Sequence, residues 1–107
     1  MLFDVSIARR GTWSHLVVVG DVDLATLPAL RAGIDSADTR DVVVDLTSVG
    51  AIDPVALGPL LMVALRCTRR SGRFVVACPD GPARDLLGEL RLDAVWELTD
   101  SAEAVFG

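Results

Sequence analysis

Residues 41–78 read DVVVDLTSVGAIDPVALGPLLMVALRCTRRSGRFVVAC, and in them two short apolar runs enclose a longer periodic stretch. The runs DVVVDL and RFVVAC contain consecutive valines, as is typical of strands that are covered on both faces. Between them, from Pro54 or Pro59 to Arg70, leucine and alanine recur at the spacing of an apolar helix face. Strand, helix and strand in this order predict a βαβ unit with two parallel strands.

The chain on both sides of this unit predicts further strands and helices. Phe3, Val5 and Ile7 alternate with polar or small residues, and a second apolar run, residues 13–19, follows a short turn, so the two indicate a β-hairpin. The other predicted elements are helices from Thr26, over 82–90 and from Asp100 or Ser101, and a short strand over 94–98. The complete order, β-β-α-β-α-β-α-β-α, predicts an α/β fold: a mixed β-sheet with flanking helices in one domain, residues 1–107.

Composition and charge narrow the class of protein. The 107 residues are 51% hydrophobic and 23% charged, with a net charge of −5, which is typical of a globular domain. The apolar runs are shorter than the ~20 residues of a membrane helix, and the start has no signal-peptide pattern, so we expect a cytoplasmic protein without membrane insertion. An acidic chain repels phosphate backbones, which argues against nucleic acid as a partner.

Cysteine and histidine are too few for a zinc site. The chain has only Cys67, Cys78 and His15, whereas structural zinc takes four ligands. We interpret the cysteines as two buried, reduced thiols, with a redox pair as the alternative. His15 lies in the predicted strand 13–19, where nothing near in sequence would orient it, and we interpret it as a surface or rim residue and not a catalytic one. We predict neither a metal nor a cofactor.

Four aspartates fall at or near the predicted carboxyl ends of strands. Asp21 and Asp23 follow one strand, and Asp45 and Asp53 bracket the loop expected after another. Ligands of open α/β sheets gather at such strand ends, where carboxylates could hold magnesium and a phosphate. The alternative is a role in turns and caps, because Asp53 directly precedes Pro54, as an N-cap precedes a first helical proline. We favour this second interpretation.

The helix that follows contains two prolines near its start. If it begins at Pro54, then Pro59 lies beyond the first turn and removes a hydrogen bond; if Gly58 is the cap, the helix begins at Pro59. We therefore predict a distorted or 3₁₀-like first turn. The nearby hydroxyls of Thr47 and Ser48 have no evident histidine or lysine partner, and no triad, P-loop or dinucleotide motif is present, so we expect no enzymatic activity.

All ten basic residues are arginines, and four of them, Arg66, Arg69, Arg70 and Arg73, cluster where this helix is expected to end. Cations at a helix C-terminus offset its dipole. We interpret the cluster as solvated capping of the helix, with a surface for an acidic partner as the alternative.

Three stretches of the chain resemble a known family. They are GDVDLATLPALRAGI (20–34), DVVVDLTSVGAIDPVALGPLL (41–61) and GRFVVACPDGPARDLLGELRLDAVWELTDSAEAVF (72–106). Over nearly the whole chain they resemble the STAS domain of anti-sigma factor antagonists, most specifically at 20–23 and in the pattern Ile52-Asp53-x-x-x-Leu57-Gly58. The resemblance implies a STAS-like mixed sheet flanked by helices, which agrees with the elements predicted above.

Members of that family typically carry Asp-Ser-Ser/Thr-Gly-Leu-Gly in the loop that enters the second helix. A serine kinase that is also the anti-sigma factor phosphorylates the second hydroxyl residue; the unphosphorylated antagonist binds this kinase, and the added dianion breaks the complex. This chain matches the pattern at Asp53 and at 57–58, but residues 54–56 read Pro-Val-Ala. The phosphoacceptor position is Val55, so the resemblance implies a STAS domain without its phosphorylation switch.

The resemblance also implies a partner-binding surface for an anti-sigma factor of the serine-kinase type. The residues of that surface are Asp21, Asp23, Asp53, Pro54, Val55, Ala56, Leu57 and Gly58. A scaffold or transport-complex STAS subunit is the first alternative. The second is an aspartate phosphotransfer receiver with Asp45 as its strand-end aspartate, although receivers need a lysine and this chain has none. Phosphorylation at Thr47 or Ser48 and a homodimer stay open.

Overall fold

The structure is a computed structural model that describes residues 2–106. In chain order the elements are β1 (Asp4–Arg10), β2 (Trp13–Val22), α1 (Leu27–Ser36), β3 (Asp41–Ile52), the 3₁₀ turn η1 (Pro54–Ala56), α2 (Leu57–Arg69), β4 (Phe74–Ala77), α3 (Pro82–Glu89), the 3₁₀ turn η2 (Leu92–Ala94), β5 (Glu97–Thr99) and α4 (Glu103–Phe106). The predicted order of strands and helices is confirmed, with η1 and η2 in addition. Within the described residues, no helix has both the length and the apolar character needed to span a membrane.

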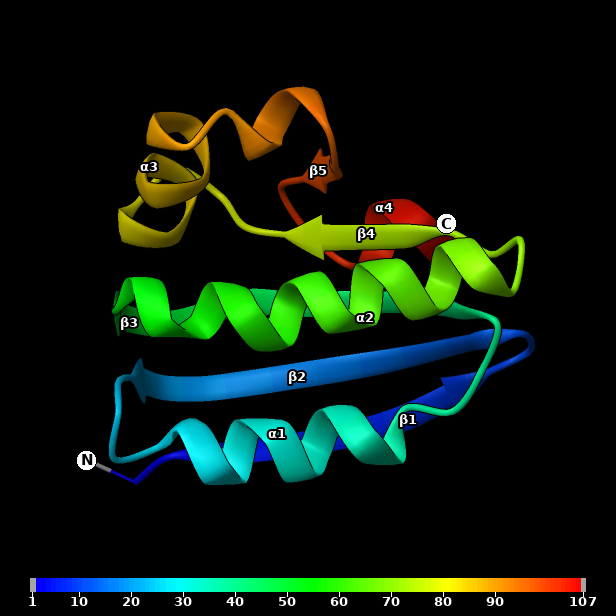
Figure 1. Cartoon of the computed structure of the whole chain (residues 1–107), viewed down its shortest axis with the longest axis horizontal. Coiled ribbons are helices and arrows are strands. Elements are labelled where there is room, and N and C mark those ends of the chain that lie inside the picture. Colours follow the sequence, from blue (N-terminus) through cyan, green and yellow to red (C-terminus); the bar gives the residue numbers. More distant parts are fainter. Residues whose placement is uncertain (1, 107) are drawn as a thin grey trace.

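The strands form one five-stranded sheet in the order β1-β2-β3-β4-β5 (Figure 1). β1 and β2 are antiparallel, and every other neighbouring pair is parallel, so the predicted hairpin and βαβ unit are both confirmed. Because β2, β3 and β4 run in the same direction, the turns that follow them leave from one edge of the sheet, here called the carboxyl edge. The opposite edge, where these strands begin, is the amino edge.

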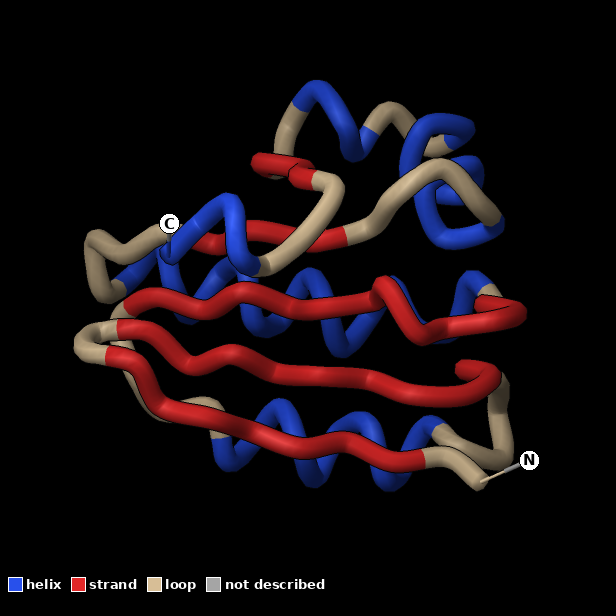
Figure 2. Tube along the Cα trace, turned by 180° about the vertical axis from the view of Figure 1, so that it is seen from behind, coloured by secondary structure: helices blue, strands red, loops and turns tan. Residues whose placement is uncertain are grey.

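Helices cover the two faces of the sheet unequally. α1, α2 and α3 pack on one face (Figure 1), where Leu16, Leu60 and Leu87 belong to the main apolar core. On the other face, seen in Figure 2, the short helix α4 covers part of the sheet. The smaller apolar cluster beneath it contains Val43, Val75, Ala77 and Ala102, with Trp13, Val105 and Phe106 packed against them.

Both central strands are longer than predicted. β2 continues to Val22 and β3 to Ile52, although the sequence indicated that they end near residues 20 and 46. The two extensions pair with each other in parallel, with Val22 beside Ile52, across two register shifts. Residues 47–51 lack an apolar alternation of their own, so the neighbouring strand and not a local pattern makes them extended.

The entry to α2 has the predicted distortion. η1 precedes the α-helix, and Asp53 is its N-cap, with the carboxylate accepting a hydrogen bond from Val55 N at 2.9 Å. Pro59 lies in the first turn of α2, where backbone amides have no partner within the helix in any case. The alternative start with Gly58 as cap is wrong, since α2 begins at Leu57.

Polar side chains at the amino edge are buried and hydrogen-bonded. Asp41 accepts hydrogen bonds from Thr12 Oγ1 and from Arg73 N, the latter at 2.8 Å. Thr39 Oγ1 donates to Asp41 O at 2.8 Å and lies 2.6 Å from Ser14 Oγ. These contacts tie the β1–β2 turn, the α1–β3 loop and the α2–β4 loop together.

The cysteines are buried and form no disulfide. Cys67 and Cys78 are both free thiols in the apolar core, as predicted. Burial raises the pKa of both thiols, which disfavours the thiolate that oxidation requires. The structure therefore favours a packing role over a redox pair.

Two of the clustered arginines reach from α2 to the end of α1 and to the loop after it, contacts that the interpretation as solvated caps of α2 did not include. Arg66 Nη2 donates to the carbonyl oxygens of Ile34 at 2.8 Å and of Ala37 at 2.7 Å. Arg70 Nη1 donates to Asp38 O at 2.7 Å. These contacts form because α1 packs beside α2, which brings the carbonyl groups at the C-terminal end of α1 within reach of side chains on α2.

Candidate partner-binding site

The carboxyl ends of β2 and β3 are joined by hydrogen bonds. Asp21 Oδ1 accepts from Ala51 N at 2.9 Å, and Asp53 N donates to Val22 O at 2.8 Å. Gly50 leaves room for the first contact, because a Cβ there would lie 2.6 Å from Asp21 Oδ1. The two segments that carry the predicted site, 30 residues apart in sequence, are thereby held side by side.

The turn after β2 is closed by its own side chains. Thr26 Oγ1 accepts a hydrogen bond from Asp23 N and donates one to Asp21 O, while Asp23 Oδ1 accepts from Thr26 N, each at 3.0 Å. Thr26 is the N-cap residue of α1, as predicted, but its hydroxyl serves this turn and not the helix. The turn presents Leu24, which is 73% exposed. Sequence reasoning missed Leu24; the available signal was a leucine inside a predicted turn.

η1 presents Val55, the position at which the sequence resemblance predicts the phosphoacceptor. Val55 is 38% exposed, and its amide is held by Asp53. Ala56 is buried and Leu57 is half-buried, so these two predicted site residues anchor the turn more than they face solvent. Gly58 is exposed, with open space around its Cα. The exposed residues of the surface are Asp23, Leu24, Asp53, Pro54, Val55 and Gly58, with Asp21 half-buried at its base.

The aspartates do not converge on a metal site. Within residues 2–106, no three His, Cys, Asp or Glu side chains are grouped so that they could hold a metal ion. Asp21, Asp23 and Asp53 each accept a backbone hydrogen bond close to the carboxyl edge, whereas Asp45 lies beside His15. The interpretation as turn and cap residues therefore holds for Asp23 and Asp53.

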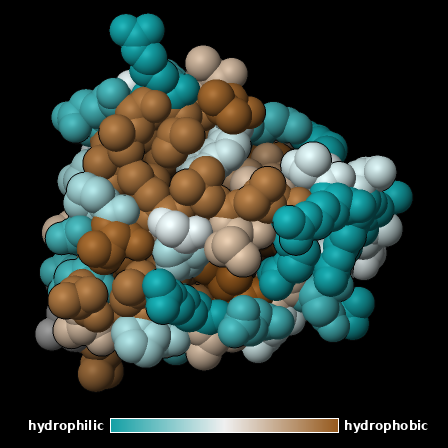
Figure 3. Space-filling model, in the orientation of Figure 1, coloured by the Kyte–Doolittle hydropathy of each residue, from teal (hydrophilic) through white to brown (hydrophobic). Residues whose placement is uncertain are grey.

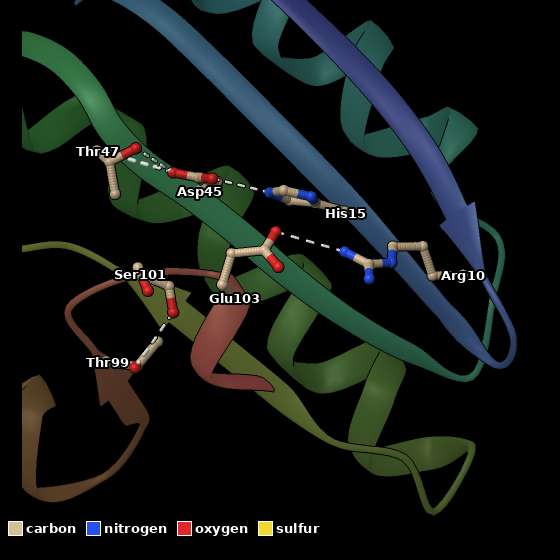
Figure 4. Close-up of polar contacts among 7 residues, drawn as sticks. All are labelled: Arg10, His15, Asp45, Thr47, Thr99, Ser101 and Glu103. Atoms are coloured by element: carbon tan, nitrogen blue, oxygen red, sulfur yellow. Dashed lines mark hydrogen bonds and ion pairs between the residues drawn. The ribbon is translucent and has the colours of Figure 1, made fainter. Parts of the chain in front are cut away.

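His15 has an environment that the sequence did not reveal. Its Nε2 lies 2.8 Å from Asp45 Oδ2, and the two side chains are only 15% and 12% exposed (Figure 4). Asp45 Oδ1 also accepts hydrogen bonds from the Thr47 hydroxyl at 2.6 Å and from the Thr47 amide at 3.0 Å. The orienting partner of His15 could not be read from neighbouring residues, because it is the parallel pairing of β2 with β3 that brings Asp45 beside it.

The arrangement of His15, Asp45 and Thr47 does not suit nucleophilic catalysis. Burial acts to raise the pKa of Asp45, but the hydrogen bonds from Thr47 and His15 outweigh it, so the pKa lies below its usual value. The carboxylate accepts from the Thr47 hydroxyl on one side and contacts the imidazole on the other (Figure 4). In a catalytic triad the imidazole stands between hydroxyl and carboxylate, so His15 is not placed to activate Thr47.

Thr47 and Ser48 lie in β3, not on the loop with Val55 where the sequence placed them. Both are exposed, and the Thr47 hydroxyl is held by Asp45. A phosphate on either residue would therefore modify the sheet and not the entry to α2.

Solved structures with the same fold include several anti-sigma factor antagonists. One from Mycobacterium paratuberculosis is 21% identical, with a TM-score of 0.89 over 98% of this chain and 92% of the other. An anti-sigma factor antagonist STAS domain protein from Planctomyces limnophilus is 16% identical, with a TM-score of 0.75 over 96% of each chain. The antagonist SpoIIAA in its unphosphorylated form is also 16% identical, with a TM-score of 0.71 over 96% of this chain and 92% of the other.

Sequence comparison gives a family but no individual relative. No curated protein matches the chain. The family model described as "Mlab, STAS domain" matches residues 5–100. The strand and helix order of the structure agrees with the fold expected of that family. The chain therefore belongs to the STAS domain family.

Proposed function

We propose that this chain is an anti-sigma factor antagonist-like interaction module that binds a serine kinase-like anti-sigma factor without phosphorylation control. The observation that carries the proposal is Val55, which takes the phosphoacceptor position on an exposed 3₁₀ turn. Residues 53–58 contain no hydroxyl group. Because valine cannot be phosphorylated, the charge and shape of this surface would stay the same, and binding of a partner would not be switched off by a kinase.

The chemistry of the surface supports a protein partner. Leu24 and Val55 are exposed apolar groups, and Asp23 and Asp53 stand beside them in the chain. An apolar contact with acidic neighbours is complementary to a partner that carries basic residues around an apolar patch. The local hydrogen bonds of Asp23 and Asp53 hold both turns in place, so little ordering is needed on binding.

The proposal assigns no catalytic activity to the chain. The carboxylate of Asp45 separates Thr47 from His15, and Asp45 is the one side-chain hydrogen-bond partner of His15 within residues 2–106. As an antagonist of an anti-sigma factor, the chain would act in the bacterial cytoplasm, on transcription.

A second candidate is a scaffold or transport-complex STAS subunit. The observation that favours it is the apolar surface of α2, where Leu61, Met62 and Leu65 are exposed beyond the loop itself. A larger assembly could cover this helix as well as the turn at Val55.

The two candidates are separated by capture from the native cell extract, with the identity of the retained protein determined by mass spectrometry. The baits are the wild-type chain, a Val55→Asp variant and a Val19→Asp variant, since Val19 is also 38% exposed but lies in β2. We expect the wild type and Val19→Asp to retain a kinase-fold anti-sigma protein. Val55→Asp should bind the purified partner at least about tenfold more weakly, because a charge enters an apolar contact.

Other results decide against the proposal. A transporter or scaffold complex on the wild-type bait supports the second candidate. Equal binding of the purified partner by Val55→Asp and the wild type excludes the Val55 surface, and a wild-type bait that retains no specific protein contradicts both candidates.

A further inference from the structure

The face formed by α1, α2 and α3 exposes large apolar side chains. Leu61, Met62 and Leu65 project from α2, and Met62 is 63% exposed. Val95, after η2, is 74% exposed, and a groove lined by Leu61, Leu65 and Val95 connects the two regions. Figure 3 shows broad hydrophobic areas on this face. Contiguous apolar surface of this kind marks an interaction site in soluble proteins.

A second groove, between α1 and α2, is basic. It has a volume of about 500 Å³, and its apolar lining residues are Ile34, Pro59, Met62 and Leu65. Arg31, Arg66 and Arg69 also line it, with Asp35 as the one acid. Among residues 2–106, no ion pair involves any of these three arginines. The groove is therefore positively charged, on a chain whose net charge is −5.

One of the three charges is fixed in place. Arg66 donates to two carbonyl oxygens at the end of α1, and its Nε is buried without a hydrogen-bond partner among the described residues. A guanidinium group held in this way is already ordered before a partner binds. Arg66 can therefore pair with an anionic group without losing further side-chain entropy.

The outward side of α3 has the complementary chemistry. Asp85 and Glu89 lie one turn apart and are exposed, and Leu90 is exposed beside them. Ala83 and Leu87 bury the other side of the helix. With Asp93 in η2, this surface has three acids against one exposed arginine, Arg91.

The acidic helix and the basic groove lie on the same face of the molecule, on either side of α2 (Figure 1). α3 lies beside the start of α2, whereas Arg66 and Arg69 lie in its last turn (Figure 1). A two-fold axis in the plane of this face that crosses α2 obliquely therefore turns one copy over onto another in the required register. Each α3 then meets the basic groove of the other copy, and the apolar α2 surfaces meet each other. The molecule extends over 31 × 27 Å in the view of Figure 1, so a stable interface of ~800 Å² per partner would occupy most of this face.

We propose that two copies of this chain form a symmetric dimer through the helix face, with the acidic α3 of each copy against the Arg31–Arg66–Arg69 groove of the other. Leu61, Met62 and Leu65 form the apolar centre of the interface, and the ion pairs around it set the register. The charged and apolar residues of the dimer lie outside the Val55 turn, and the two surfaces share Gly58, which also lines the groove.

Charge reversal with rescue tests the dimer, measured by sedimentation velocity of the full chain up to about 1 mM. The first variant is Arg31→Glu/Arg69→Glu, the second is Asp85→Arg/Glu89→Arg, and the control is Arg9→Glu/Arg10→Glu on β1. We expect a concentration-dependent dimer for the wild type and the control. Each of the first two variants should dissociate about 100-fold more readily, because like charges then face each other. Circular dichroism confirms that each variant is folded.

The decisive sample is an equimolar mixture of the first two variants. In the proposed dimer of the two variants, one ion-pair cluster keeps its wild-type charges and the other is restored with reversed sign, so the mixture should sediment as a dimer although each variant alone is a monomer. A wild-type chain that stays monomeric over the whole range overturns the proposal. So does dimerisation of either variant at wild-type strength, or a mixture of two folded variants that stays monomeric.

Discussion

The two edges of the sheet use aspartate in different ways. At the amino edge, Asp41 is buried and accepts hydrogen bonds from Thr12 and Arg73, residues on two other connections of the chain. At the carboxyl edge, Asp23 and Asp53 are exposed, and each bonds an amide two or three residues away. The first arrangement links distant segments, and the second shapes a local turn while it leaves charge on the surface. Contacts that stabilise the fold and the proposed partner-binding surface thus lie at opposite edges of the same sheet.

The largest effect of this difference is expected on replacing Asp41. Asp41→Ala removes the shared acceptor of the Thr12 hydroxyl and the Arg73 amide, and a hydrogen bond to a charged group contributes about 1.5–3 kcal/mol, so we expect a loss of about 2–3 kcal/mol in the free energy of unfolding. Urea unfolding measures this loss. Asp35→Ala, an exposed aspartate on α1, is the control and should change stability by less than about 0.5 kcal/mol. If both substitutions lowered the free energy of unfolding by the same amount, Asp41 would have no special role in stability.

Acid should remove the contribution of the buried Asp45 carboxylate to stability. The pKa of Asp45 is lowered in the folded chain, since hydrogen bonds from Thr47 and His15 outweigh the effect of burial. A lowered folded pKa means that the stabilisation is complete above the unfolded carboxyl pKa of about 3.9 and is lost as pH falls through the folded value. Asp45→Asn should therefore cost about 1–2 kcal/mol at pH 7, and this difference from the wild type should shrink below about pH 4. Urea unfolding at both pH values tests the sign: a difference that grows in acid is the contrary result.

Local patterns predicted most of the fold, because the elements concerned are determined by their own residues. The consecutive valines at 42–44 indicated a buried strand, and the two prolines indicated a distorted entry to α2; both predictions are confirmed. The extension of β3 to Ile52 was missed, because only its pairing with β2 makes residues 47–51 extended.

The contacts that the sequence could not predict join residues that are far apart in the chain. His15 and Asp45 meet because β2 and β3 pair in one particular register, and Arg66 reaches the end of α1 because two helices pack side by side. For the candidate site, the cap at Asp53 was predicted from its proline neighbour, whereas the exposed Leu24 depended on how the turn at Asp23 closes.

The smallest of these effects is expected at Asp53, and it separates the shape of the turn from its charge. Asp53→Ala removes the acceptor of the Val55 amide, as loss of an N-cap does, so we expect a loss of about 1 kcal/mol in the free energy of unfolding and faster hydrogen exchange at that amide. Asp53→Asn keeps an acceptor at the cap and should restore both quantities nearly to their wild-type values. If a partner reads the carboxylate, Asp53→Asn should still bind it more weakly than the wild type does, because the turn is intact and only the charge is gone. Wild-type affinity in Asp53→Asn, measured by calorimetry with the captured partner, would mean that Asp53 acts only through the turn that it holds.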